Sequence, residues 1–185
     1  MKKKSLALVL ALAMIVVCVV GGTLAWLIAT TGSVTNTFTY GDIDITLAET
    51  TGTSYKMIPG YTIDKNPKVT VLADSEKCYL FVKVVKSTNF DNFMTCTIAD
   101  GWTALTGVNG VYYRVVDTAD MGTAYSVLAN DKVTVKDTVT KTMLNDLNAE
   151  GATQPTLTFT AYACQYNNSN GTNFSAIEAW NNVTA

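Results

Sequence analysis

The chain has 185 residues, of which 48% are hydrophobic and 15% charged, and its formal net charge is −2. This length and composition are sufficient for one domain with a buried core, and they exclude intrinsic disorder and a mini-protein held by disulfides. The sequence contains no histidine. Ser-His-Asp and Cys-His catalysis and HExxH zinc sites all need an imidazole, so most familiar hydrolase mechanisms are excluded.

The first 25 residues have the pattern of a secretory signal peptide. Lys2–Lys4 precede an apolar run from Leu6 to Val20, and small residues follow. We expect cleavage between Ala25 and Trp26, which would make residues 26–185 the secreted domain. The alternative is a retained membrane anchor, because the apolar stretch from Leu6 to Ala29 is long enough to span a bilayer.

Cleavage at this site would change the charge balance of the protein. It removes three lysines and no acidic residue, which shifts the formal charge from −2 to −5. A mildly acidic secreted domain is a poor match for nucleic acid or for anionic lipid surfaces. We therefore expect no nucleic-acid partner.

The secreted part has the alternating pattern of β-strands. Short runs rich in Val, Ile, Thr, Tyr and Phe are separated by turn dipeptides such as Pro59-Gly60 and Asn109-Gly110. The predicted strands are Val34–Tyr40, Asp42–Ala48, Lys68–Ala73, Cys78–Lys86, Met94–Ile98, Val111–Val116, Lys132–Val139 and Thr156–Gln165. Many short strands without βαβ alternation predict an all-β, antiparallel sandwich or jelly roll.

Two short helices are expected beside the strands. Residues Thr142–Ala149 place three apolar residues on one face and end near Gly151. Ser175 and Glu178 form a capping-box pattern, which predicts a short terminal helix that packs through Ile177 and Trp180.

Several short segments, in this order, resemble the TasA/camelysin-like family of Gram-positive bacteria. The segments are Gly21–Trp26, Val34–Leu47, Met57–Val71, Ser75–Val84, Pro155–Ala163 and the pair Ala179-Trp180. The resemblance implies a jelly-roll-like β-sandwich preceded by an N-terminal signal helix that a SipW-type signal peptidase removes. It also implies a location outside the cell, in the extracellular matrix or at the cell surface.

The function implied by this resemblance is structural. TasA-like subunits form extracellular fibres of the biofilm matrix, and each lends its N-terminal strand to the next. The expected partners are copies of the chain itself, together with other matrix or cell-wall components. Camelysin relatives have been called metallopeptidases, but this chain has neither a histidine nor an HExxH helix. We expect no enzymatic activity, no catalytic residue, no metal and no cofactor.

Residues 26–40 are the candidate donor strand. Val34, Phe38 and Tyr40 alternate with threonines, which suits a strand added to the edge of a neighbour's sheet. Backbone hydrogen bonds contribute about 1 kcal/mol each, which does not exceed the cost of ordering a residue. Burial of apolar side chains must therefore stabilise the pairing. The alternative is that this segment is the first strand of its own sandwich.

Three cysteines remain after cleavage. Cys78 and Cys96 are predicted to face the core and Cys164 to lie on a more polar strand face. A Cys78–Cys96 disulfide is one hypothesis and would stabilise the fold by roughly 3 kcal/mol. The other is that all three are reduced, buried thiols.

Two further groups of residues have a functional and a structural interpretation. Asp42 and Asp44 share one strand face, where they either bind a cation or are simply solvated opposite an isoleucine stripe. Trp102, Tyr112 and Tyr113 are aromatics that would serve a monomeric glycan- or wall-binding module, the alternative function.

Overall fold

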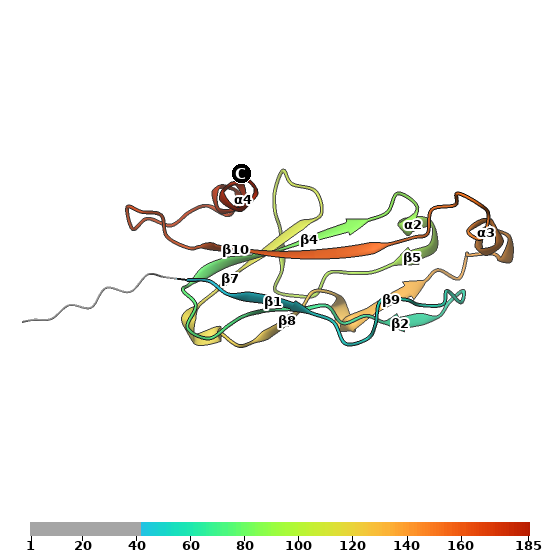
Figure 1. Cartoon of the computed structure of the whole chain (residues 1–185), viewed down its shortest axis with the longest axis horizontal. Coiled ribbons are helices and arrows are strands. Elements are labelled where there is room, and N and C mark those ends of the chain that lie inside the picture. The colour runs from blue at the N-terminus through green and yellow to red at the C-terminus, as the bar shows by residue number, and fades with distance from the viewer. Residues whose placement is uncertain (1–41) are drawn as a thin grey trace, which may run out of the picture. The chain divides into compact units, whose positions relative to one another are not determined.

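A computed structural model describes residues 42–185 as three antiparallel sheets with a few short helices, which confirms an all-β fold (Figure 1). The sheets have the strand orders β1-β3-β8, β10-β4-β7-β6 and β2-β9-β5. The strands are β1 Ile45–Ala48, β2 Thr62–Asp64, β3 Lys68–Val71, β4 Cys78–Lys86, β5 Met94–Thr95, β6 Thr103–Ala104, β7 Val111–Val116, β8 Ala124–Ser126, β9 Lys132–Val135 and β10 Leu157–Gln165. The α-helices are α2 Phe90–Phe93, α3 Lys141–Asp146 and α4 Ala176–Thr184, and the 3-10 turns are Thr118–Asp120 and Ala129–Asp131.

Strand β4 is the centre of the domain. It pairs with β10 along its whole length and with β7 on its other side, so both of its edges are hydrogen-bonded. A central strand that is covered on both faces needs apolar side chains on both, and the apolar run of β4 supplies them. Its side chains on one face, with those of β3, β7 and β10, form a core between this sheet and the sheet of β1, β3 and β8.

Helix α4 covers part of the opposite face of β4. It begins at the predicted capping box, in which Ser175 and Glu178 bond each other's backbone amides. The Trp180 ring lies 5.4 Å from that of Phe81 and 5.1 Å from that of Tyr162, measured between centroids. The predicted terminal helix and its contact through Trp180 are confirmed, whereas Ile177 is partly exposed.

The third sheet has its own apolar cluster. Phe93 at the end of α2 and Leu147 after α3 pack against Ile63 of β2 and Val135 of β9. Thr140 caps α3 by accepting a hydrogen bond from the Met143 amide, so the helix begins at Lys141, one residue before the predicted Thr142. It ends at Asp146, before the predicted Ala149. This sheet extends the core beyond the end of β4.

The predicted strands agree best with the structure where the chain is buried. Cys78–Lys86 and Val111–Val116 match the predicted bounds, while the other predicted strands within the described residues are shorter than expected. Strands β2, β6 and β8 and the single-turn helix α2 were not predicted from the sequence. Elements of two to four residues are too short to show the hydrophobic periodicity from which strands and helices are predicted.

The segments that precede residue 42 lie outside the described residues. They include the signal peptide, the Ala25–Trp26 cleavage site and the candidate donor strand with Val34, Phe38 and Tyr40. Within residues 42–185, no helix is long and apolar enough to cross a membrane.

The cysteines in the described part of the chain are free thiols, so the structure does not form the Cys78–Cys96 disulfide. Cys78 is the first residue of β4, whereas Cys96 shares a hollow with Val84 and Lys86 at the other end of that strand. Six residues of strand span about 20 Å, far beyond the Cα separation of a disulfide. Cys164 was predicted to lie on a polar face, but it is buried because α4 covers its end of β10.

Thiol labelling of the native protein should distinguish these cysteines. Burial raises the pKa of the Cys78 thiol to about 11, and burial also raises the pKa of Cys96 and Cys164. Since the thiolate is the reactive form, all three should react slowly at pH 8, and the half-buried Cys96 should react first. Iodoacetamide labelling followed by peptide mass spectrometry would test this. Equal labelling of Cys78 and Cys96 before unfolding would contradict it.

Candidate functional site

The outer edge of β10 has no hydrogen-bonded strand among residues 42–185. The register with β4 shows which backbone groups face this edge. The Thr156 carbonyl accepts a hydrogen bond from the Ser87 amide and the Tyr166 amide donates to the Lys77 carbonyl, so even-numbered residues face β4. Because the direction alternates along a strand, the amides and carbonyls of the odd-numbered residues face away from β4. These residues are Leu157, Phe159, Ala161, Ala163 and Gln165.

This edge lacks two of the usual protections against strand addition, namely short length and charge. Natural edge strands are short, charged, interrupted by proline or covered. Strand β10 is nine residues long and contains no charged residue, and no charge occurs anywhere in residues 151–177. The other edge strands in the described part of the chain, β1, β2, β5, β6 and β8, have two to four residues each. The length and neutrality of β10 therefore distinguish it as a pairing surface.

The two ends of the β10 edge differ in their surroundings. The residues just before β1 lie beside the Gln165 end, where Asp42 and Ile43 line a shallow hollow with Ala163 and Gln165, and β1 itself also contacts β10 (Figure 1). Leu157, at the other end, borders a cavity.

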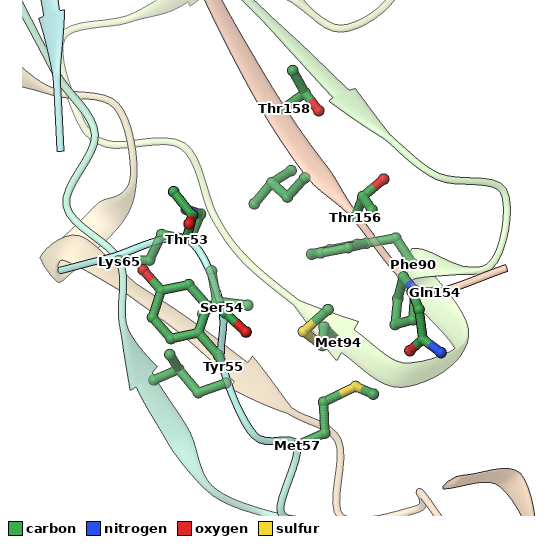
Figure 2. Close-up of a pocket in the computed structure, with 14 residues that line it drawn as sticks. Thr53, Ser54, Tyr55, Met57, Lys65, Phe90, Met94, Gln154, Thr156 and Thr158 are labelled. Atoms are coloured by element: carbon green, nitrogen blue, oxygen red, sulfur yellow. The ribbon is translucent and has the colours of Figure 1, made fainter. Parts of the chain in front are cut away.

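This cavity has a volume of about 460 Å³ and lies between the start of β10 and the loop that precedes β2. Figure 2 shows Tyr55 and Met57 on one wall, Phe90 and Thr156 on the opposite wall, and Met94 between them. The buried side chains that line it are apolar and the rim is mainly hydroxyl-bearing. The lining residues are Thr53, Ser54, Tyr55, Met57, Ile63, Lys65, Phe90, Met94, Val133, Gln154, Pro155, Thr156, Leu157 and Thr158.

A hydrogen-bonded network holds the loop wall of the cavity in place. The Lys65 ammonium donates to both carboxylate oxygens of Glu49, at 2.7 and 2.8 Å. The Tyr55 hydroxyl bonds Glu49 and the Gly52 carbonyl, and Thr51 also donates to Glu49. Lys65 and Glu49 are mostly buried and neutralise each other, so the cavity presents no net charge from this pair.

The candidate glycan-binding aromatics do not form one platform. Tyr112 and Tyr113 are adjacent on β7, so they point to opposite faces of the sheet, and both are half-buried. The Trp102 indole donates to the Ser126 carbonyl, and the Arg114 guanidinium lies over its ring. All three side chains therefore contribute to packing.

The two aspartates near the start of β1 match the structural interpretation. Asp42 and Asp44 are exposed, whereas Ile43 and Ile45 pack against the core, as the alternation predicted. Within residues 42–185, no three metal-ligating side chains lie close enough together to hold a metal ion. The β10 edge was not predicted as a site, although the uncharged run from Gly151 to Ile177 around it is visible in the sequence.

Comparisons with protein-family models, with curated proteins and with solved structures give no match to this chain.

Proposed function

We propose that this protein is a secreted structural subunit of an extracellular fibre or biofilm matrix, with a jelly-roll-like sandwich as its body. In this proposal the N-terminal strand within residues 26–40 adds to the outer edge of β10 in a neighbouring copy. The proposal combines the family resemblance of the sequence with a physical feature of the fold, the outer edge of β10. It requires neither a catalytic group nor a cofactor.

The observation that best supports the proposal is the uncharged nine-residue edge of β10. An edge of this kind is a template for pairing with another chain, and proteins that do not use one usually block it. Residues 26–41 also contain no charged residue and are rich in threonine, like β10 itself. Pairing of these two segments would bury no unpaired charge.

Deletion of residues 26–40 should abolish fibre formation while the rest of the chain stays folded. The protein beginning at Trp26 is expected to form regular fibres after concentration and incubation, because it supplies both strand and edge. Negative-stain electron microscopy of the two proteins at equal concentration is the measurement, and circular dichroism checks that the shortened chain is folded.

Two outcomes would count against the proposal. Fibres from the shortened protein would show that residues 26–40 are not the donor. Dispersed monomers of the protein beginning at Trp26, under all conditions tried, would favour the alternative of a monomeric binding module at the cell surface.

A further inference from the structure

We infer that the cavity beside the Leu157 end of β10 binds the Phe38 side chain of a second copy of this chain. The inference rests on the proposed function, and it identifies the position at which the subunits are anchored. Three observations lead to it: the position of the cavity, the chemistry of its walls, and the length of chain between Phe38 and the fold.

The cavity lies where an added strand would place its side chains. Leu157 lines the cavity, and its backbone amide and carbonyl face the open edge. A strand that pairs there would direct alternate side chains toward the same interior as Leu157 and Phe159, which pack against the core. Peptide recognition by strand addition uses this combination, in which the edge bonds the backbone and a pocket selects a side chain.

The walls of the cavity fit an apolar aromatic side chain. Met57 and Met94 are unbranched and adaptable, and thioethers make favourable contacts with aromatic rings. Phe90 and Ile63 supply further apolar surface. The Lys65–Glu49 pair is already satisfied internally, so the cavity does not call for a charged group.

Phe38 is the residue of the alternating row in the donor segment that fits these walls best. The row consists of Val34, Asn36, Phe38 and Tyr40. Asn36 and Tyr40 would bring polar groups that need partners in an apolar interior, and Val34 would fill less of the space. Phe38 is large and wholly apolar.

A second copy is a better source of Phe38 than the chain itself. Asp42 lines a hollow with Cys164, whereas the cavity is lined by Thr156 to Thr158 at the other end of β10. Six to eight residues of β10 separate these points, which is about 20–26 Å. Phe38 precedes Asp42 by four positions, which extend at most about 14 Å. A chain's own Phe38 would therefore reach only the near end of its cavity, and only with this segment fully extended along β10, whereas the strand of a second copy can pair at the Leu157 end directly.

Photo-crosslinking tests this assignment directly. The protein beginning at Trp26 is prepared with p-benzoylphenylalanine in place of Phe38, as a mixture of unlabelled and nitrogen-15-labelled copies, and is irradiated after incubation. Benzophenone reacts readily with methionine C–H bonds, so crosslinks to Met57 or Met94 are expected. Peptide mass spectrometry should find pairs that join an unlabelled peptide to a labelled one. The matched control has the same probe in place of Thr39, which alternation directs to the opposite face, and these crosslinks should be lost.

The outcomes separate this inference from the proposed function. Fibres without crosslinks from position 38 to either methionine would overturn the cavity assignment and leave fibre formation standing. Crosslinks found only within one copy would overturn the assignment to a second copy. Dispersed protein without crosslinks between copies would overturn both.

Discussion

Replacement of Leu157 by proline should prevent fibre formation while the domain stays folded. The Leu157 amide faces away from β4, so the proline ring removes no hydrogen bond within the sheet. The ring would instead occupy the place of the incoming strand and remove a donor from the edge. One lost hydrogen bond alone, at about 1 kcal/mol, would raise the concentration needed for assembly several-fold, and the blocked edge should raise it further.

Leu157→Ala is the matched control for this variant. Both substitutions remove the leucine side chain, which is partly buried against the core, so both should lower the free energy of unfolding. Both substitutions also shorten a side chain that lines the cavity, and only the proline changes the hydrogen-bonding edge, so the difference in assembly between the two variants reports on the edge. Thermal unfolding would compare the stability of the two variants, and electron microscopy with sedimentation would compare their assembly. Fibres from Leu157→Pro at the wild-type concentration would show that the Leu157 end of β10 is not the acceptor.

Trp180→Ala should destabilise the domain more than any other single substitution in α4. The indole is buried against Phe81 and Tyr162, and it is the main apolar contact between α4 and the central sheet. Truncation of a buried tryptophan costs about 3–5 kcal/mol, a large part of the roughly 5–15 kcal/mol by which domains are stable. Denaturant unfolding monitored by circular dichroism would measure the loss.

Ile177→Ala is the control in the same helix. Ile177 is 38% exposed, so its truncation should lower the free energy of unfolding by much less than the truncation of Trp180 does. Equally small effects of the two substitutions would mean that α4 does not contribute to the core of the domain. The aromatic face of β4 would then remain as a second contact surface between subunits.

The way in which α4 covers the central sheet bears on how the subunits could associate. Tyr79 and Phe81 of β4 share their face with Lys83 and Val85. The two aromatics are buried, and Trp180 packs against Phe81, whereas the Lys83 and Val85 side chains are exposed. This face of the sheet is therefore half-covered by α4. It leaves the edge of β10, rather than an aromatic sheet face, as the surface suited to assembly.

The sequence by itself determined the elements whose signals are local. The apolar run Cys78–Lys86 and the alternation Val111–Val116 predicted β4 and β7 with correct bounds, because a buried strand repeats its pattern over many residues. The capping box at Ser175 and Glu178 located the start of α4, since both partners lie within one turn. The isoleucine stripe of Ile43 and Ile45 at the start of β1 was likewise predicted from alternation alone.

Only the tertiary structure decided features that depend on which segments meet. Cys164 is buried although its strand face is rich in threonine, because α4 returns from the end of the chain to cover it. The sequence cannot show that β10 lies at the edge of its sheet, since strand order depends on pairings between distant residues. The cavity exists because the loop before β2 packs near the start of β10, about 100 residues later in the chain. Non-local pairing thus decides where a strand edge remains open, while local periodicity decides only which segments become strands.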